Sequence, residues 1–178
     1  MDRQPAVSTA GVEATLALAI QHYNGGRREA AEALCHGLLQ QHGTQPALLQ
    51  LLAVLCHERG ALTEARGFVE ASLAARPGHG PTLMVAALIR QDQHEPAAAQ
   101  AALEQVLQQQ PGHVPALVNL GIVLLEQGRL DAAMQRFGQA HRQRPEAFAR
   151  IAGALCAEST GALWVHAADL RAALGAAA

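Results

Sequence analysis

The 178-residue sequence contains no lysine, few aromatic residues and almost no net charge. Aromatic residues make up 3% of the chain, and the formal net charge is −2. A surface that binds nucleic acid needs a basic excess to neutralise phosphates, so nucleic acid is not an expected partner. The scarcity of aromatic and β-branched residues disfavours strands, whereas the abundant alanine, leucine, glutamine, glutamate and arginine favour helix. We therefore expect an all-α protein.

Long apolar runs are also missing. A membrane-spanning helix needs about 18 or more consecutive apolar residues, and no stretch approaches that length. Near the N-terminus, Glu13 and Thr15 interrupt the apolar run that a secretion signal would need. We therefore expect a cytoplasmic protein that does not insert into a membrane.

Cysteine is sparse as well. Cys35, Cys56 and Cys156 are an odd number and show no CxxC spacing, which argues against a disulfide framework and against a zinc site. All three lie in apolar stretches with helical character. We expect them to be small core residues.

Catalytic and metal-binding motifs are absent from the sequence. The nine histidines show no HExxH spacing, and the chain has no nucleophile elbow, Walker loop or dinucleotide glycine motif. His79 and His113 recur in the related segments PGHGP and PGHVP, so a repeated linker position accounts for them without metal binding. We expect no catalytic residue, no metal site and no cofactor, and hence a protein that is not an enzyme.

Self-similarity is the main positive feature of the sequence. Pro77, Pro111 and Pro145 recur at intervals of 34 residues. This register predicts four units, which are 12–45, 46–79, 80–113 and 114–147. Four columns then align across the units: alanines (Ala31, Ala65, Ala99, Ala133), small residues (Ala19, Ala53, Ala87, Gly121), mostly leucines (Leu18, Leu52, Ala86, Leu120) and a turn position (Gly26, Gly60, His94, Gly128).

Each column has a physical role. Small residues allow two antiparallel helices to approach closely, the turn position suits the left-handed residue that ends a helix, and proline stops the second helix. Each unit is therefore predicted to be a helix, a turn and a second helix. First helices are expected near 13–25, 47–59, 81–92 and 115–127, and second helices near 28–41, 62–75, 96–109 and 130–143.

The pattern resembles the tetratricopeptide repeat family over residues 12–147. The last unit, LVNLGIVLLEQGRLDAAMQRFGQAHRQRP, matches best, because it has Leu117, Gly121, Gly128, Ala133 and Phe137 on the signature columns. The resemblance implies a right-handed α-solenoid of helix–turn–helix repeats with a C-terminal capping helix.

The two ends of the chain depart from this period. We expect residues 1–11 to be disordered, and residues 148–178 to form a degenerate repeat and a capping helix. Helices are predicted over 146–158 and 162–174, separated by a break at 159–161. A solenoid needs a cap over its last apolar face, but the tail could instead bind a partner.

The first helices are apolar on nearly every face, as in LLQLLAVLC at 48–56. Such a helix should be covered all round, and an exposed apolar surface marks an interaction site. In the family that the chain resembles, the first helices line the concave side. The inward columns here would be Leu16, Ile20, Tyr23, Gln50, Val54, His57, Met84, Leu88, Gln91, Val118, Ile122 and Leu125. The alternative is that these residues belong to the core.

These columns indicate the kind of partner. An apolar peptide or an amphipathic helix would suit such a groove. Binding of a terminal carboxylate, which some members of the family achieve with lysine and asparagine, does not fit a chain without lysine. We therefore expect a protein-interaction scaffold or adaptor. The alternatives are a secretion-type chaperone, a self-assembling structural scaffold in which the chain associates with itself, and a regulatory module that acts beside a larger enzyme.

Overall fold

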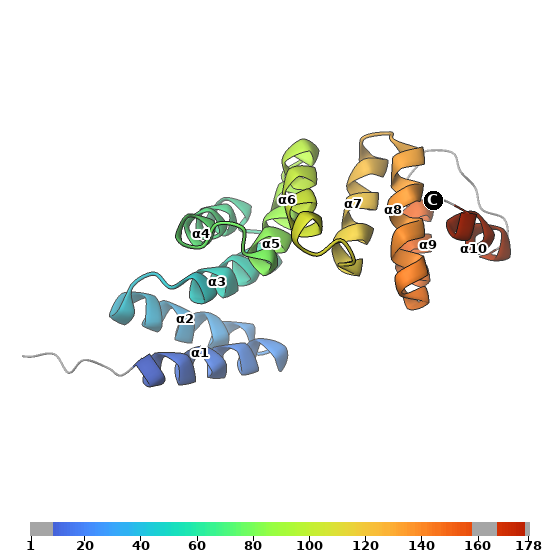
Figure 1. The fold of residues 1–178 in the computed structure, drawn as a ribbon. Coiled ribbons are helices and arrows are strands. Elements are labelled where there is room, and N and C mark those ends of the chain that lie inside the picture. The colour runs from blue at the N-terminus through green and yellow to red at the C-terminus, as the bar shows by residue number, and fades with distance from the viewer. Residues whose placement is uncertain (1–8, 158–166, 177–178) are drawn as a thin grey trace, which may run out of the picture. The chain divides into compact units, whose positions relative to one another are not determined.

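The computed structural model describes residues 9–157 and 167–176, which contain ten α-helices, one 3₁₀ helix and no strand. The chain divides into two compact units, residues 1–77 and 78–178. Each unit consists of paired helices (Figure 1). The all-α fold expected from composition and period is confirmed.

The first unit contains two helix pairs. α1 (Thr9–Asn24) packs against α2 (Arg28–His42), and α3 (Pro46–Glu58) packs against α4 (Leu62–Ala75). These bounds agree closely with the predicted helices except at the N-terminus. Residues 9–11 were expected to be disordered but begin α1, because Val12 is buried in the core of this unit. Residues 1–8 lie outside the described part of the chain.

The second unit continues the same pattern. α5 (Gly80–Asp92) pairs with α6 (Pro96–Gln109), and α7 (Val114–Glu126) pairs with α8 (Leu130–Gln143). The chain then forms the 3₁₀ helix η1 (Pro145–Ala147), α9 (Phe148–Ala157) and α10 (Ala167–Ala176). Proline lies at the first or second position of α3, α5, α6 and α7, where its missing N–H removes no helical hydrogen bond.

The turn column has the backbone conformation that the sequence predicts. Gly26, Gly60 and Gly128 have φ angles of 74°, 80° and 72°, and His94 has a φ angle of 58° at the equivalent place. Only glycine adopts this left-handed region without a steric penalty. The third repeat (residues 80–113) therefore makes the same turn as the other repeats, but with a strained residue in place of glycine.

The alanine column and the small-residue column lie in the interior of each helix pair. All four residues of the alanine column are fully buried, and Ala19, Ala53 and Ala87 are also buried. In the next column, Leu52, Ala86 and Leu120 are buried, whereas Leu18 is 43% exposed. Leu18 differs because α1 is the first helix of the described chain, so no earlier second helix covers this side.

The C-terminal helices pack against the other helices of the second unit. α10 contacts α8 and buries Leu170 and Leu174, and Arg142 Nη1 donates to the Leu174 carbonyl oxygen at 3.4 Å. The Arg171 guanidinium lies 4.1 Å from the centroid of the Phe148 ring, a cation–π contact between α10 and α9. This is the arrangement expected of a capping helix. The predicted break at 159–161 lies outside the described residues.

Candidate functional site

In the first unit, the predicted inward residues lie on one side of α1 and α3. Leu16, Tyr23, Gln50, Val54 and His57 are half-buried. Ile20 is more open at 43% exposed and, with Leu18, is one of two exposed large hydrophobic residues in the described chain. Leu16 and Tyr23 pack against the core of this unit, and all six side chains keep part of their surface accessible.

In the second unit, the same columns divide into two groups. Met84, Leu88, Gln91 and Ile122 are half-buried. Val118 and Leu125 are only 2% and 1% exposed, so the expectation that they line an open groove is corrected. They are buried because α6, α8 and α9 all pack against α7. We call the ten remaining residues the first-helix face: Leu16, Ile20, Tyr23, Gln50, Val54 and His57 in the first unit, and Met84, Leu88, Gln91 and Ile122 in the second.

A polar bridge recurs at one end of this face. In the first unit, Tyr23 Oη donates to Glu58 Oε1 at 2.7 Å, and Arg28 Nε pairs with the other carboxylate oxygen. In the second unit, Gln91 Nε2 donates to Glu126 Oε1. Both bridges join residues 35 positions apart. Each bridge therefore joins the last turn of one first helix to the C-terminal end of the next first helix in the same unit.

The bridges expose a column that the apolar pattern did not reveal. Glu58, Asp92 and Glu126 recur every 34 residues, and each is the last residue of a first helix. The helix dipole disfavours a negative charge at this end, so helix stability alone does not explain three acids there. The 34-residue spacing was visible in the sequence. The column places Glu58 beside the first-helix face of the first unit, and Asp92 and Glu126 beside that of the second.

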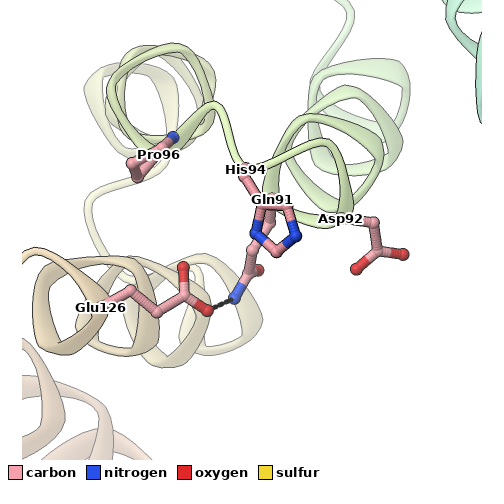
Figure 2. A pocket seen from close by; sticks show the side chains of 5 residues that line it. All are labelled: Gln91, Asp92, His94, Pro96 and Glu126. Atoms are coloured by element: carbon pink, nitrogen blue, oxygen red, sulfur yellow. Dashed lines mark hydrogen bonds between the residues drawn. The ribbon is translucent and has the colours of Figure 1, made fainter.

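A recess lies beside these acids in the second unit. It has a volume of about 590 Å³ and is lined by Gln91, Asp92, His94, Pro96 and Glu126. Figure 2 shows the His94 ring and the Gln91 amide between the two carboxylates in that view. The strained turn at His94 is what presents its imidazole at the end of α5. A basic side chain would find two carboxylates within this recess.

The histidines of the PGH segments act locally. His113 Nδ1 accepts a hydrogen bond from the Ala116 backbone N–H at 3.2 Å, which caps the start of α7. His79 Nδ1 lies 2.9 Å from Thr82 Oγ1 at the start of α5. In the described residues, no group of three or more His, Cys, Asp or Glu side chains is placed to hold a metal ion.

The cysteines occupy two kinds of environment. Cys35 and Cys56 are buried as expected, and burial raises the pKa of the Cys35 thiol to about 11. Burial also raises the pKa of Cys56, although Arg59 acts in the opposite direction. Cys156 was expected in the core but is exposed, because α9 buries Ile151 and Leu155 on its other side. The two buried thiols are poor nucleophiles, since nucleophilic attack requires the thiolate.

Two tetratricopeptide repeat models match the sequence, one over residues 16–79 and the other over residues 90–158. The chain belongs to the tetratricopeptide repeat (TPR) family. The second match extends to residue 158, beyond the last predicted unit, and so covers α9. Among the described residues, no helix is both long and apolar enough to span a membrane.

Several solved TPR structures share the fold. TTC0263, a thermophilic TPR protein in Thermus thermophilus, is 19% identical with a TM-score of 0.70, covering 93% of this chain and 98% of that chain. MamA MSR-1 is 19% identical with a TM-score of 0.69, covering 93% and 95%. YrrB, a TPR protein with an unusual peptide-binding site, is 16% identical with a TM-score of 0.68, covering 91% and 85%. Comparison with the curated proteins gives no match. These identities support likeness of fold alone.

Proposed function

We propose that this TPR protein is a non-catalytic adaptor that binds a segment of another protein on its first-helix face. One observation carries the proposal: Ile20, Val54, Leu88 and Ile122 occupy one column, and none of them is fully covered by the fold. A column of partly open Ile, Val and Leu side chains suits an apolar peptide or one face of an amphipathic helix.

The strength of binding can be bounded. Six large aliphatic side chains remain on the face: Leu16, Ile20, Val54, Met84, Leu88 and Ile122. Complete burial of such a side chain contributes about 1.5–3 kcal/mol, and half-buried ones have roughly half of that left to gain. The apolar contribution is then about 4.5–9 kcal/mol, against an association cost of about 4–15 kcal/mol. Apolar contacts alone therefore give weak binding.

The test separates loss of binding from loss of folding. Val54→Glu, Leu88→Glu and Ile122→Glu, made singly, should fold nearly normally because each new carboxylate can reach solvent. Leu52→Glu and Leu120→Glu are the matched controls, since Leu52 and Leu120 are 0% and 1% exposed and a buried unpaired charge is strongly destabilising. Thermal melts would rank the five variants.

Binding is then measured with an identified partner. The wild-type chain captures proteins from a lysate, mass spectrometry identifies one, and its affinity for each variant is measured with purified components. The three face variants should bind more weakly while remaining folded. If they melt as low as the core variants, these positions belong to the core. If they fold and bind the partner with unchanged affinity, the partner uses another surface.

A second candidate function is self-association through the outer side of α1. The observation that favours it is Leu18, whose equivalents Leu52, Ala86 and Leu120 are all buried while Leu18 stays 43% exposed. A second copy could cover the exposed side of Leu18. Light scattering over a range of protein concentrations should show dimers or larger species that Leu18→Glu abolishes. A chain that stays monomeric at all concentrations would rule this candidate out.

A further inference from the structure

The first unit contains an apolar recess formed by α2, α3 and α4. Its volume is about 320 Å³, and its walls are almost wholly apolar: Leu39 from α2, Leu49 from α3, and Phe68 and Ala71 from α4. Phe68 and Leu39 pack on the core of this unit without being fully buried. The recess borders the second helices, so its residues are not part of the first-helix face.

A glycine in α4 leaves this recess open. Gly67 borders it, and a Cβ added there would meet no atom within 4 Å. Glycine inside a helix costs roughly 0.5–1 kcal/mol relative to alanine. No neighbouring atom would clash with a Cβ at Gly67, so close packing does not explain why glycine stands here despite this cost.

The other units place different side chains at the equivalent positions. In the fourth unit, 68 positions further along, Gly67, Phe68 and Ala71 are replaced by Gln135, Arg136 and Gln139. Arg136 Nη1 donates to Gln139 Oε1 at 3.2 Å, so long polar side chains bond to each other there. These three lining residues of the second repeat (residues 46–79) are thus replaced by long polar ones in the fourth repeat.

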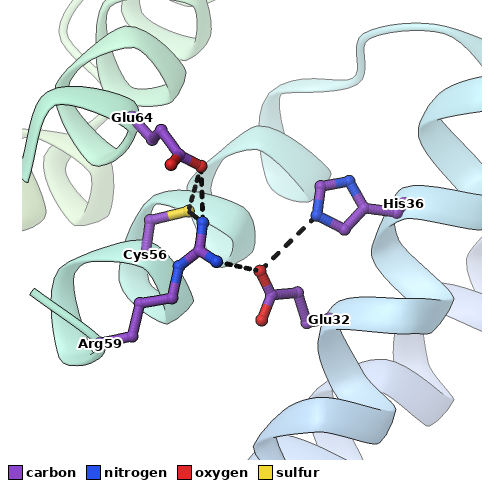
Figure 3. Close-up of polar contacts among 5 residues, drawn as sticks. All are labelled: Glu32, His36, Cys56, Arg59 and Glu64. Carbon is purple, nitrogen blue, oxygen red and sulfur yellow. Dashed lines mark hydrogen bonds and ion pairs between the residues drawn. The ribbon is translucent and has the colours of Figure 1, made fainter. Parts of the chain in front are cut away.

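A carboxylate lies at the edge of the recess. Glu64 borders the recess, and Arg59 pairs with Glu64 Oε2 at 2.5 Å and with Glu32 Oε1 at 3.4 Å. Figure 3 shows the Arg59 guanidinium between the two carboxylates, with His36 on the far side of Glu32. One guanidinium thus forms ion pairs with two carboxylates. Glu64 is 61% exposed and can pair with an incoming cation as well.

We propose that this recess binds one large apolar side chain of a partner protein, next to a lysine or arginine of the same segment. Ligand pockets range upward from about 300 Å³, so the recess suits a single side chain better than a cofactor. The apolar walls account for the first half of the motif, and the exposed Glu64 carboxylate at the edge accounts for the second. The site is separate from the proposed first-helix face and does not depend on it.

The experiment uses the full chain and three short probes. They are the acetylated, amidated dipeptides phenylalanine–arginine, phenylalanine–glutamate and glycine–arginine, titrated into ¹⁵N-labelled protein and followed by NMR. The phenylalanine–arginine probe should produce saturable shifts of the amides of Leu39, Gly67 and Phe68. The other two probes should bind more weakly, each because it lacks one half of the motif.

Two variants test the two halves of the site. Gly67→Leu fills the recess from a helical position with free space, so the protein should fold and lose affinity on the order of tenfold or more, a factor that corresponds to about 1.4 kcal/mol. Ala101→Leu, at the equivalent exposed position of α6, is the matched control and should change nothing. Glu64→Gln should weaken the arginine probe roughly two- to fivefold.

Three outcomes would overturn the proposal. They are the absence of saturable shifts at the recess, undiminished binding by Gly67→Leu, and equal affinity for the arginine and glutamate probes. Shifts of the same amides on raising the protein concentration without a probe would assign the recess to a second copy of the chain, which also overturns the proposal.

Discussion

Arg150 Nη2 of α9 donates a 2.5 Å hydrogen bond to Oδ1 of Asn119, a residue of α7 that is only 4% exposed. The equivalent positions in the second and third units are Leu51 and Val85, so a polar side chain interrupts an otherwise apolar column. A buried amide is costly unless it is hydrogen-bonded. α9 thus supplies the partner that makes Asn119 tolerable, which ties the tail to the last complete TPR.

Arg150→Ala should lower the free energy of unfolding by about 1–3 kcal/mol, because the buried Asn119 oxygen would lose its donor. Urea denaturation would measure the loss. Asn119→Val is the control, since it restores the column's apolar character. In that background Arg150→Ala should have little effect. Equal losses in both backgrounds would show that Arg150 acts through something other than Asn119.

The left-handed turn at His94 gives a stabilising substitution. Glycine occupies the same turn in the other three units, and His94 has a φ angle of 58°. The strain for a residue with a Cβ is about 1–2 kcal/mol, and glycine's greater freedom in the unfolded chain cancels part of it. His94→Gly should therefore raise stability by several tenths to about 1 kcal/mol.

Gln93→Gly is the matched control for this substitution. Gln93 is the neighbouring residue and has a φ angle of −83°, so glycine relieves no strain there and should lower stability. Thermal melts of the two variants should shift in opposite directions. If both variants were destabilised, the turn at His94 would be unstrained.

The Glu58 bridge predicts a pH dependence. The hydrogen bond from Arg28 and then that from Tyr23 hold the pKa of Glu58 below its ordinary value of 4.5. A carboxylate with a lowered pKa in the folded state stabilises the fold above its ordinary pKa, and this contribution disappears as the pH falls through the folded-state pKa. The difference in melting temperature between wild type and Arg28→Ala should thus be largest near neutral pH and should vanish in acid. A difference independent of pH would contradict the bridge.

The sequence predicted the helices well because their signals are local. Proline after each second helix, the left-handed turn column and the alanine column are each read from one residue at its own position. Burial of a whole face is different, since it depends on which helix lies next. Leu18 matches Leu52 in sequence but not in exposure, and Val118 is buried where Leu16, Gln50 and Met84 are half-buried.

The polar features were missed for another reason. The acidic column is periodic in the sequence, but an apolar pattern search passes over Glu58, Asp92 and Glu126. The recess at Gly67 has no linear signature, because Leu39, Leu49 and Phe68 come from three helices. The surroundings of its neighbour Glu64 are not visible in the sequence either, because they depend on the ion pairs that Arg59 makes with both Glu64 and Glu32.

A reciprocal change in volume links two columns of the repeat. The small-residue column is alanine in the first three units, where the facing column contains Cys35, Val69 and Leu103. In the fourth unit, glycine stands at 121 and phenylalanine at 137. A Cβ on Gly121 would lie 2.3 Å from Phe137 Cε1, far inside van der Waals contact. The Phe137 ring fits because Gly121 lacks the methyl group that alanine has at this position in the other repeats.

Gly121→Ala should therefore destabilise the protein by about 1–3 kcal/mol through overpacking, even though alanine is the better helix former. Phe137→Leu alone should also destabilise, because it leaves a cavity beside Gly121. The double variant recreates the Ala87 and Leu103 pair of the third unit, so it should be more stable than the sum of the single losses allows. Urea denaturation of the four proteins gives the coupling free energy as a double-mutant cycle. Additive losses would mean that the ring moves aside, and the fourth unit would then tolerate alanine at 121 as the other units do.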